Sequence, residues 1–427
     1  MTAAVPAPRG AELLDRTAID EPHALLARLR TRGPVVPVGD TGVHAVLTWA
    51  AIEEGLEREA DFSANLTGAL MRGPDGAPSI FEFPSSAGAS AVIATADEPA
   101  HGVHRQLIQP RLAARRIAAL EPRLRVWTRE ALAPWLASSG GDFTPIAERI
   151  PALALAALLG LPESDVDDFR TWSMVAGDIL AGDVPIERIL VLAEEAGRMS
   201  AYLTEHLHGA EADLQAGPDA PLLHALSRGV RSGAIDEAEA VGISGVLFGA
   251  AGESTAALIG STMRTLAERP DLADALRSDP ELIGRFVEEV VRLEPPFKFH
   301  YRLVKRDCEL AGTKLEPGDR LMLMWAAANR DPDVFDDPDE LRLDRRHPKA
   351  HMSFGRGPHF CVGAPLARLE ARVVIEEALQ ATRALSLIAG DPPVYTGSIF
   401  VRRLEHLPVR LETHRAPERD ASARPEQ

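Results

Sequence analysis

The chain has 427 residues, of which 45% are hydrophobic and 26% charged, as in an ordinary globular protein. Its net charge of −17 leaves no basic excess to meet phosphates, which argues against a nucleic-acid-binding protein. The two cysteines, Cys308 and Cys361, do not form a disulfide framework, and they fit a reducing cytosol.

Both ends of the chain are predicted to be disordered. Residues 1–10 are rich in Ala and Pro and contain no apolar run, so they are neither a signal peptide nor a membrane anchor. Residues 415–427 form a charged tail rich in Pro and Ala. No change in composition divides residues 11–414. We therefore expect a single soluble, cytoplasmic domain over 11–414 that binds no membrane.

The pattern of residues predicts a mainly α fold with small β-sheets, an α+β class. Residues 35–38 and 43–48 predict a short β-hairpin. A loop rich in Gly and Pro is expected over 63–91, where it would border a binding pocket. Helices are expected over 107–136, 146–159, 166–180, 186–207 and about 236–268, and further strands over 299–304, 321–325 and 400–411.

The segment 241–263 is apolar and rich in small residues except for one charge, Glu253. It is long enough to span a membrane, but a central carboxylate would cost roughly 2.5–3.5 kcal/mol there, so a buried core helix is the better interpretation. Its glycines at 242, 245, 249 and 252 indicate either close helix packing or close approach to a cofactor. The adjacent Glu253, Ser254 and Thr255 favour the cofactor, because buried polar groups are costly unless they are used. A hydrolase nucleophile elbow is excluded, since neither the strand before the serine nor the Gly after it is present.

The strongest motif surrounds the second cysteine, where residues 354–363 are FGRGPHFCVG. Gly355 and Gly357 allow a tight turn and close approach to a flat cofactor. Pro365 suits the first turn of a helix, which places Cys361 at a helix N-terminus, where free N–H groups favour a thiolate. Nothing around Cys308 supports chemistry, and it is expected to be structural.

This motif resembles the haem-ligand loop of the cytochrome P450 family, in which Phe, Gly, a basic residue, Cys and Gly stand at fixed offsets. The resemblance implies the cytochrome P450 fold, with haem b (iron-protoporphyrin IX) sandwiched between a long central helix and the cysteine loop. It implies that Cys361 is the axial ligand of the iron, and that Phe354 and Gly363 belong to the haem site.

Haem-propionate contacts are implied by a second resemblance. Residues 97–105, DEPAHGVHR, resemble the family's Asp-x-Pro-x-His-x-x-x-Arg, whose His and Arg bind the propionates. This implies that role for His101 and Arg105. Arg302 and His359 match the other propionate contacts, and four basic groups around two carboxylates make physical sense.

An ion network is implied by a third resemblance. Glu289 and Arg292 lie three residues apart on a predicted helix and resemble the family's Glu-x-x-Arg. The third member would be an arginine upstream of the cysteine loop. Arg345 is the candidate, and Arg346 is the alternative because this connection is one residue longer than usual.

The central helix resembles the family's distal helix, whose acid–alcohol pair supplies protons for dioxygen activation. The resemblance implies this role for Glu253 and Ser254, with Thr255 as the alternative hydroxyl if the register differs by one. The family usually has Gly two residues before the acid and Thr after it, where this chain has Ala251 and Ser254. This departure leaves open whether the reaction is ordinary hydroxylation.

Taken together, the resemblance implies a haem-thiolate monooxygenase that activates O2 and inserts one oxygen atom into a small to medium apolar or amphipathic molecule, in secondary metabolism or catabolism. Oxidative coupling or desaturation without oxygen insertion is one alternative, and a non-catalytic haem-binding ligand sensor is another. The chain contains no flavin or iron–sulfur segment, so a ferredoxin and a ferredoxin reductase are the implied electron donors. Arg356, Arg368 and Arg372 would form their basic docking face. Lys298, among aromatic residues, is expected to pair with a substrate carboxylate or to extend to solvent.

Overall fold

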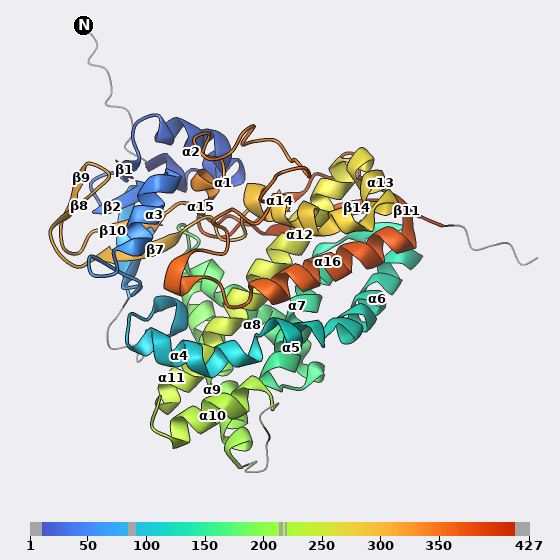
Figure 1. Cartoon of the computed structure of the whole chain (residues 1–427), viewed down its shortest axis with the longest axis horizontal. Helices are drawn as coiled ribbons and strands as arrows, with labels where there is room; N and C mark the ends of the chain where they lie inside the picture. Colours follow the sequence, from blue (N-terminus) through green and yellow to red (C-terminus); the bar gives the residue numbers. More distant parts are fainter. Residues whose placement is uncertain (1–10, 84–90, 213–216, 218–219, 415–427) are drawn as a thin grey trace, which may run out of the picture.

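The computed structural model describes residues 11–83, 91–212, 217 and 220–414, and it has the expected mainly α architecture with small sheets (Figure 1). The predicted disordered ends, 1–10 and 415–427, lie outside the described residues. The helices are α1 (Arg16–Asp20), α2 (Pro22–Arg30), α3 (Trp49–Glu57), α4 (Ala100–Ile108), α5 (Ala114–Ala118), α6 (Glu121–Ala137), α7 (Thr144–Leu159), α8 (Val166–Ile179), α9 (Ile186–Ala212), α10 (Leu222–Arg231), α11 (Glu237–Leu247), α12 (Ser254–Glu268), α13 (Pro270–Ser278), α14 (Ile283–Leu293), α15 (Trp325–Ala328) and α16 (Ala364–Ala381).

The strands form one larger sheet and several small ones. The larger sheet has the order β1-β2-β10-β7-β3, in which β10 runs parallel to β2 and the other neighbours are antiparallel. A second sheet has the order β11-β14-β6, and three hairpins pair β4 with β5, β8 with β9 and β12 with β13. The strands are β1 (Val35–Pro37), β2 (Val43–Val46), β3 (Phe62–Ser63), β4 (Gly68–Arg72), β5 (Pro78–Glu82), β6 (Gly140–Asp142), β7 (His300–Val304), β8 (Cys308–Leu310), β9 (Thr313–Leu315), β10 (Arg320–Leu323), β11 (Thr382–Leu387), β12 (Val394–Tyr395), β13 (Leu404–His406) and β14 (Pro408–Thr413).

Two predicted segments differ from the structure. The loop expected over 63–91 contains the β4–β5 hairpin, because β4 buries apolar side chains such as Leu70, whose N–H also donates to the Tyr301 hydroxyl at 2.9 Å. Residues 84–90 of that loop lie outside the described residues. The helix expected over 107–136 is broken into α4, α5 and α6, because Pro110 and Pro122 lack the N–H that would continue a helix.

The helix expected over about 236–268 is one continuous stretch with a change of geometry inside it. The π-helical segment η5 (Phe248–Glu253) separates α11 from α12. This stretch contacts α7, α8 and α16, and in Figure 1 it passes behind α16 through the middle of the molecule. Among the described residues, Glu237–Glu268 is the helical stretch long and apolar enough to cross a membrane, and 67% of its most apolar window is buried, as in a core helix of a soluble protein.

Candidate functional site

A cavity of about 1410 Å³, including its opening, is bordered by the central helical stretch, the cysteine loop and β7. Its lining is mostly apolar with a few polar and basic groups, as in sites that bind small molecules and cofactors. The lining includes Ile93, Ala94, His101, Arg105, Val246, Leu247, Ala250, Ala251, Ser254, Thr255, Phe297, His300, Arg302, Trp325, Phe354, His359, Cys361 and Gly363.

The Cys361 thiol faces this cavity from the N-terminus of α16. The loop before it turns through Gly355 and Gly357, both with positive φ, and the Cys361 N–H donates to Phe354 O at 2.8 Å. Burial raises the pKa of the Cys361 thiol, while the N–H groups of Gly363 and Ala364 hydrogen-bond to its sulfur and act in the opposite direction. A half-buried thiol with two backbone donors is a suitable iron ligand.

Two arginines, Arg105 and Arg302, line the cavity and form no ion pair among the described residues. Arg105 Nη1 donates to Phe360 O at 2.7 Å, and Arg302 Nη1 donates to Tyr301 O at 2.8 Å. Neither guanidinium forms an ion pair with a carboxylate of the described residues. Burial lowers the pKa of Arg302 to about 10. Guanidinium groups without a carboxylate partner are complementary to a ligand that carries carboxylates. Arg105 and Arg302 therefore fit a haem with its propionate groups.

The two predicted histidines, His101 and His359, line the same cavity. The rings of His101 and His359 stack with their centroids 4.0 Å apart, and His101 Nδ1 lies 2.9 Å from Glu98 Oε1. The structure therefore brings together all four residues predicted to contact propionates, although they come from distant parts of the sequence.

Glu253 does not line the cavity. Its carboxyl group is 1% exposed, accepts a hydrogen bond from Arg403 Nε at 3.1 Å through Oε1, and leaves Oε2 without a partner. Arg403 Nη2 and Nη1 also lie 3.7 Å from Asp178 and 3.9 Å from Glu148. Burial raises the pKa of Glu253 to about 8, although the charge of Arg403 opposes the shift.

The glycines of the central stretch serve helix packing rather than approach to a cofactor. A Cβ at Gly252 would overlap with Ser173 of α8, and a Cβ at Gly177 of α8 would overlap with the Glu253 carboxyl group. Neither glycine lines the cavity. The preference for a cofactor contact at the glycines of this stretch is therefore wrong. Gly249 and Gly252 lie against α8, Gly245 faces Met199 and Gly242 faces Val92, and none of the four lines the cavity.

The two candidate hydroxyls both line the cavity. Ser254 Oγ donates to Ala250 O, a carbonyl within the π-helical segment. Among the described residues, the Thr255 hydroxyl has no hydrogen-bond partner. Both hydroxyls can therefore contact a molecule in the cavity. The Ser254 hydroxyl does so while it donates to the π-helical turn, and the Thr255 hydroxyl has no competing partner among the described residues.

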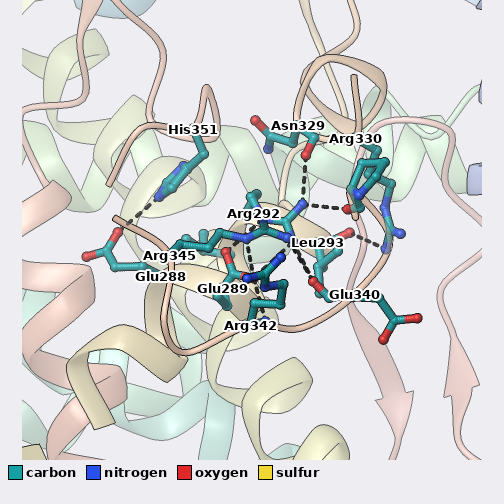
Figure 2. Close-up of polar contacts among 12 residues, drawn as sticks. Glu288, Glu289, Arg292, Leu293, Asn329, Arg330, Glu340, Arg342, Arg345 and His351 are labelled. Atoms are coloured by element: carbon teal, nitrogen blue, oxygen red, sulfur yellow. Dashed lines mark hydrogen bonds and ion pairs between the residues drawn. The ribbon is translucent and has the colours of Figure 1, made fainter. Parts of the chain in front are cut away.

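The buried ion network forms around Glu289 (Figure 2). Arg292 makes a bidentate pair with it, at 2.8 and 2.9 Å, and Arg345 Nε lies 2.9 Å from the same carboxylate. Arg345 is thus the third member, and Arg346 is exposed. Arg292 also donates to the carbonyls of Asn329, Pro338 and Glu340. The network fastens α14 to the chain segment that leads into the cysteine loop.

Three basic residues make contacts that the sequence did not predict. Arg368 binds Glu288, at 2.6 and 3.0 Å, and Arg372 binds Glu121 and Glu376. These two arginines thus form ion pairs within the protein, and the docking face stays a prediction. Lys298 neither borders the cavity nor reaches solvent: it is 3% exposed, and its ammonium donates to Ser398 O at 2.6 Å.

Sequence reasoning missed His300, which lines the cavity two residues before Arg302 on the same strand. Its Nδ1 accepts a hydrogen bond from Trp325 Nε1 at 2.7 Å, so the proton of the neutral ring lies on Nε2. Burial lowers the pKa of His300 to about 4, which keeps the ring neutral. The alternation of side chains along a strand could have placed it beside Arg302, but no motif marked it.

Comparisons with known proteins agree with this geometry. The family model described as "Cytochrome P450" matches residues 190–395. Cytochrome P450 144 of Mycobacterium tuberculosis is 39% identical over 92% of this chain and 90% of the relative, and erythromycin C-12 hydroxylase of Saccharopolyspora erythraea is 35% identical over 90% and 94%. The structure of a mutant of P450 EryK in complex with erythromycin B has a TM-score of 0.79 and 31% identity, covering 95% of this chain and 99% of that one.

Proposed function

The chain belongs to the cytochrome P450 family of haem-iron oxidoreductases, and we propose that it inserts one oxygen atom of O2 into a small to medium apolar or amphipathic molecule. The observation that carries the proposal is the Cys361 thiol at the N-terminus of α16, facing an apolar cavity that also presents unpaired guanidinium groups. When bound, the haem would supply the reductive activation of dioxygen, which a thiolate ligand promotes.

We assign the cofactor as haem b. Arg105, Arg302, His101 and His359 would hold its two propionates, and Phe354 and Gly363 would lie against the ring. A c-type haem requires a Cys-x-x-Cys-His segment, which this sequence lacks. The unpaired guanidinium groups support this assignment, because they offer charge-assisted hydrogen bonds that no carboxylate of the described chain uses.

Proton delivery is assigned to Glu253 together with Ser254 or Thr255. A pKa of about 8 keeps Glu253 protonated at neutral pH, so it has a proton to donate. The Ser254 hydroxyl is the better supported relay, because it follows Glu253 directly and is hydrogen-bonded within the π-helical turn. We therefore expect Ser254→Ala to reduce the product formed per electron pair consumed more than Thr255→Val does.

The molecule to be oxidised would occupy the apolar part of the cavity. His300 would offer it one neutral N–H donor, which suits an oxygen acceptor on an otherwise apolar molecule. We propose that its electrons come from a ferredoxin with its reductase. A cytoplasmic location is part of the same proposal, since the two cysteines suit a reducing compartment.

The first test is the absorption spectrum of the purified protein, reduced and exposed to carbon monoxide. A strongly red-shifted Soret band is expected, and Cys361→Ser should lack it while Cys308→Ser keeps it. A band typical of histidine or thiol ligation in the native protein would contradict the assignment of Cys361. Product mass then separates oxygen insertion, which adds one oxygen atom, from coupling or desaturation, which adds none.

A further inference from the structure

Ile93 has a strained backbone on the wall of the cavity. Its φ is +39°, in the left-handed region that β-branched residues rarely adopt. Its side chain is 7% exposed and lines the cavity next to Ala94. A conformation of this kind persists only where the surrounding structure imposes it. The contact that holds Ile93 therefore determines the shape of the wall.

That contact is made by His104 of α4. The Ile93 N–H donates to His104 Nδ1 at 3.2 Å, and His104 Nε2 lies 3.3 Å from Glu239 Oε1. Because Nδ1 accepts, the proton of the neutral imidazole lies on Nε2, from which it is donated to the carboxylate. His104 is fully buried, so a water molecule cannot take the place of the imidazole in either hydrogen bond.

Glu239 is itself fixed in place. Its Oε2 accepts the Asp236 N–H at 2.8 Å, and Asp236 Oδ1 accepts the Glu239 N–H at 2.7 Å, a capping box that begins α11. The same helix supports the strained turn a second time, because Gly242 of α11 faces Val92. The short turn η2 (Ile93–Thr95) is thus held between α4 and α11.

We propose that His104 is a positioning residue that sets substrate specificity by holding Ile93 in its strained conformation. His104 does not line the cavity, so it acts through Ile93 and not by contact with the bound molecule. The proposal rests on the proposed function, because it treats this cavity as the place where substrate binds. Hydrogen bonds from Glu239 through His104 to Ile93 then connect the start of α11 to the cavity wall.

Three substitutions separate the two hydrogen bonds of His104. His104→Asn places an oxygen near the position of Nδ1, so it keeps an acceptor for the Ile93 N–H and loses Glu239. His104→Gln places its amide near the position of Nε2, so it keeps Glu239 and loses the Ile93 bond. His104→Phe keeps a ring of similar size and loses both bonds.

Two measurements on the holoenzyme test the proposal. The first is spectral titration with imidazole and with the bulkier 4-phenylimidazole. In the Gln and Phe variants we expect the ratio of the imidazole Kd to the 4-phenylimidazole Kd to rise by about fivefold or more, because the released wall no longer excludes the larger probe. The Asn variant should keep the native ratio. The second is amide hydrogen exchange of the segment containing Ile93, expected to be about tenfold faster in the Gln and Phe variants alone.

Native selectivity and native exchange in the Gln variant would overturn the proposal. Equal changes in the Asn and Gln variants would also overturn it, since they would indicate a general loss of packing. If the Phe variant does not fold, the Asn and Gln pair still decides. Absence of any azole-induced spectral change in the native protein would instead count against the proposed function, and hydrogen exchange would still decide the role of His104.

Discussion

Glu253 is a carboxylic acid in an environment that disfavours its charge. One oxygen has a single cationic partner, Arg403, and the other has none. The desolvation of a buried carboxylate outweighs the attraction of that one guanidinium, which is why its pKa rises to about 8. The side chain is therefore a neutral acid at pH 7, and ionising it costs stability.

The sign of the resulting pH dependence follows from proton counts. Between about pH 5 and about pH 8 the unfolded chain has lost the Glu253 proton while the folded protein keeps it, so the native protein loses stability as pH rises. Glu253→Gln removes this loss. We expect the variant to gain up to about 4–5 kcal/mol relative to the native protein across that interval, and its unfolding midpoint to fall less with pH.

Thermal unfolding of both holoproteins at a series of pH values measures this difference. Glu405→Gln, at an exposed position, is the matched control and should follow the native curve. A constant difference between native protein and Glu253→Gln at all pH values would show that Glu253 is already ionised in the native state.

Individual site residues can be predicted from the sequence when they belong to a motif, and cannot when they do not. Cys361, His101 and Arg105 were predicted to share a site because each stands in a motif of fixed spacing, and all three line the cavity. Arg403 contacts Glu253 across 150 positions in the sequence, and His300 faces the cavity only because β7 alternates its side chains. Such partners depend on the packing of distant segments, which no local pattern records.

Among the elements, the π-helical segment η5 is the one that shapes the site. Its side chains face two ways: Ala250 and Ala251 face the cavity, while Gly252 lies against Ser173 of α8. Segments of this kind are uncommon and tend to occur at functional sites. Here the close approach of α8, which only a glycine permits, holds the segment and its last residue, Glu253, in place.

Gly252→Ala should therefore destabilise the protein and disturb η5. The added methyl group overlaps with Ser173, and overpacking of this kind costs about 1–3 kcal/mol. Gly197→Ala, at an exposed position inside α9 with no atom near the added Cβ, should instead stabilise by about 1 kcal/mol. Thermal unfolding compares the two variants. Restoration of stability by adding Ser173→Gly to Gly252→Ala would identify the overlap as the cause, and equal effects at both glycines would contradict it.

The existence of the central helix was predictable, but its interruption was not. The 3.6-residue periodicity and small side chains of 236–268 marked a buried helix. The π-helical turn packs against α8 and its Glu253 pairs with Arg403, and both contacts join segments that are distant in the sequence. The same limit explains the missed β4–β5 hairpin, because its glycines and prolines indicated a loop while its burial against Tyr301 determined a sheet.

For the molecule as a whole, charge is organised by pairing between distant segments. The chain carries a net charge of −17, yet Arg368 and Arg372 are used to join α16 to α14 and α6. The composition could not show which arginines pair with acids inside the protein. The overall class and the order of the motifs were predictable, because both depend on local spacing and average composition.

The most consequential of these pairings is the Glu289 network, which fastens α14 to the segment 336–345 (Figure 2). Arg345 contributes one carboxylate contact and donates to the carbonyls of Asp336, Asp337 and Glu340. Arg345→Leu would remove one of the two cations that hold the buried Glu289 carboxylate, and removing one partner of a buried pair costs about 3–5 kcal/mol.

Its neighbour in the sequence provides a matched control. Arg346 is exposed and has no hydrogen bond or ion pair among the described residues, so Arg346→Leu should change the free energy of unfolding by less than about 0.5 kcal/mol. Unfolding of both holoproteins, followed by haem absorbance and by circular dichroism, tests this contrast. Because Arg345 holds the segment leading into the cysteine loop, haem release should precede loss of helix in Arg345→Leu and coincide with it in Arg346→Leu. Equal stability of the two variants would mean that Glu289 is adequately held by Arg292 alone.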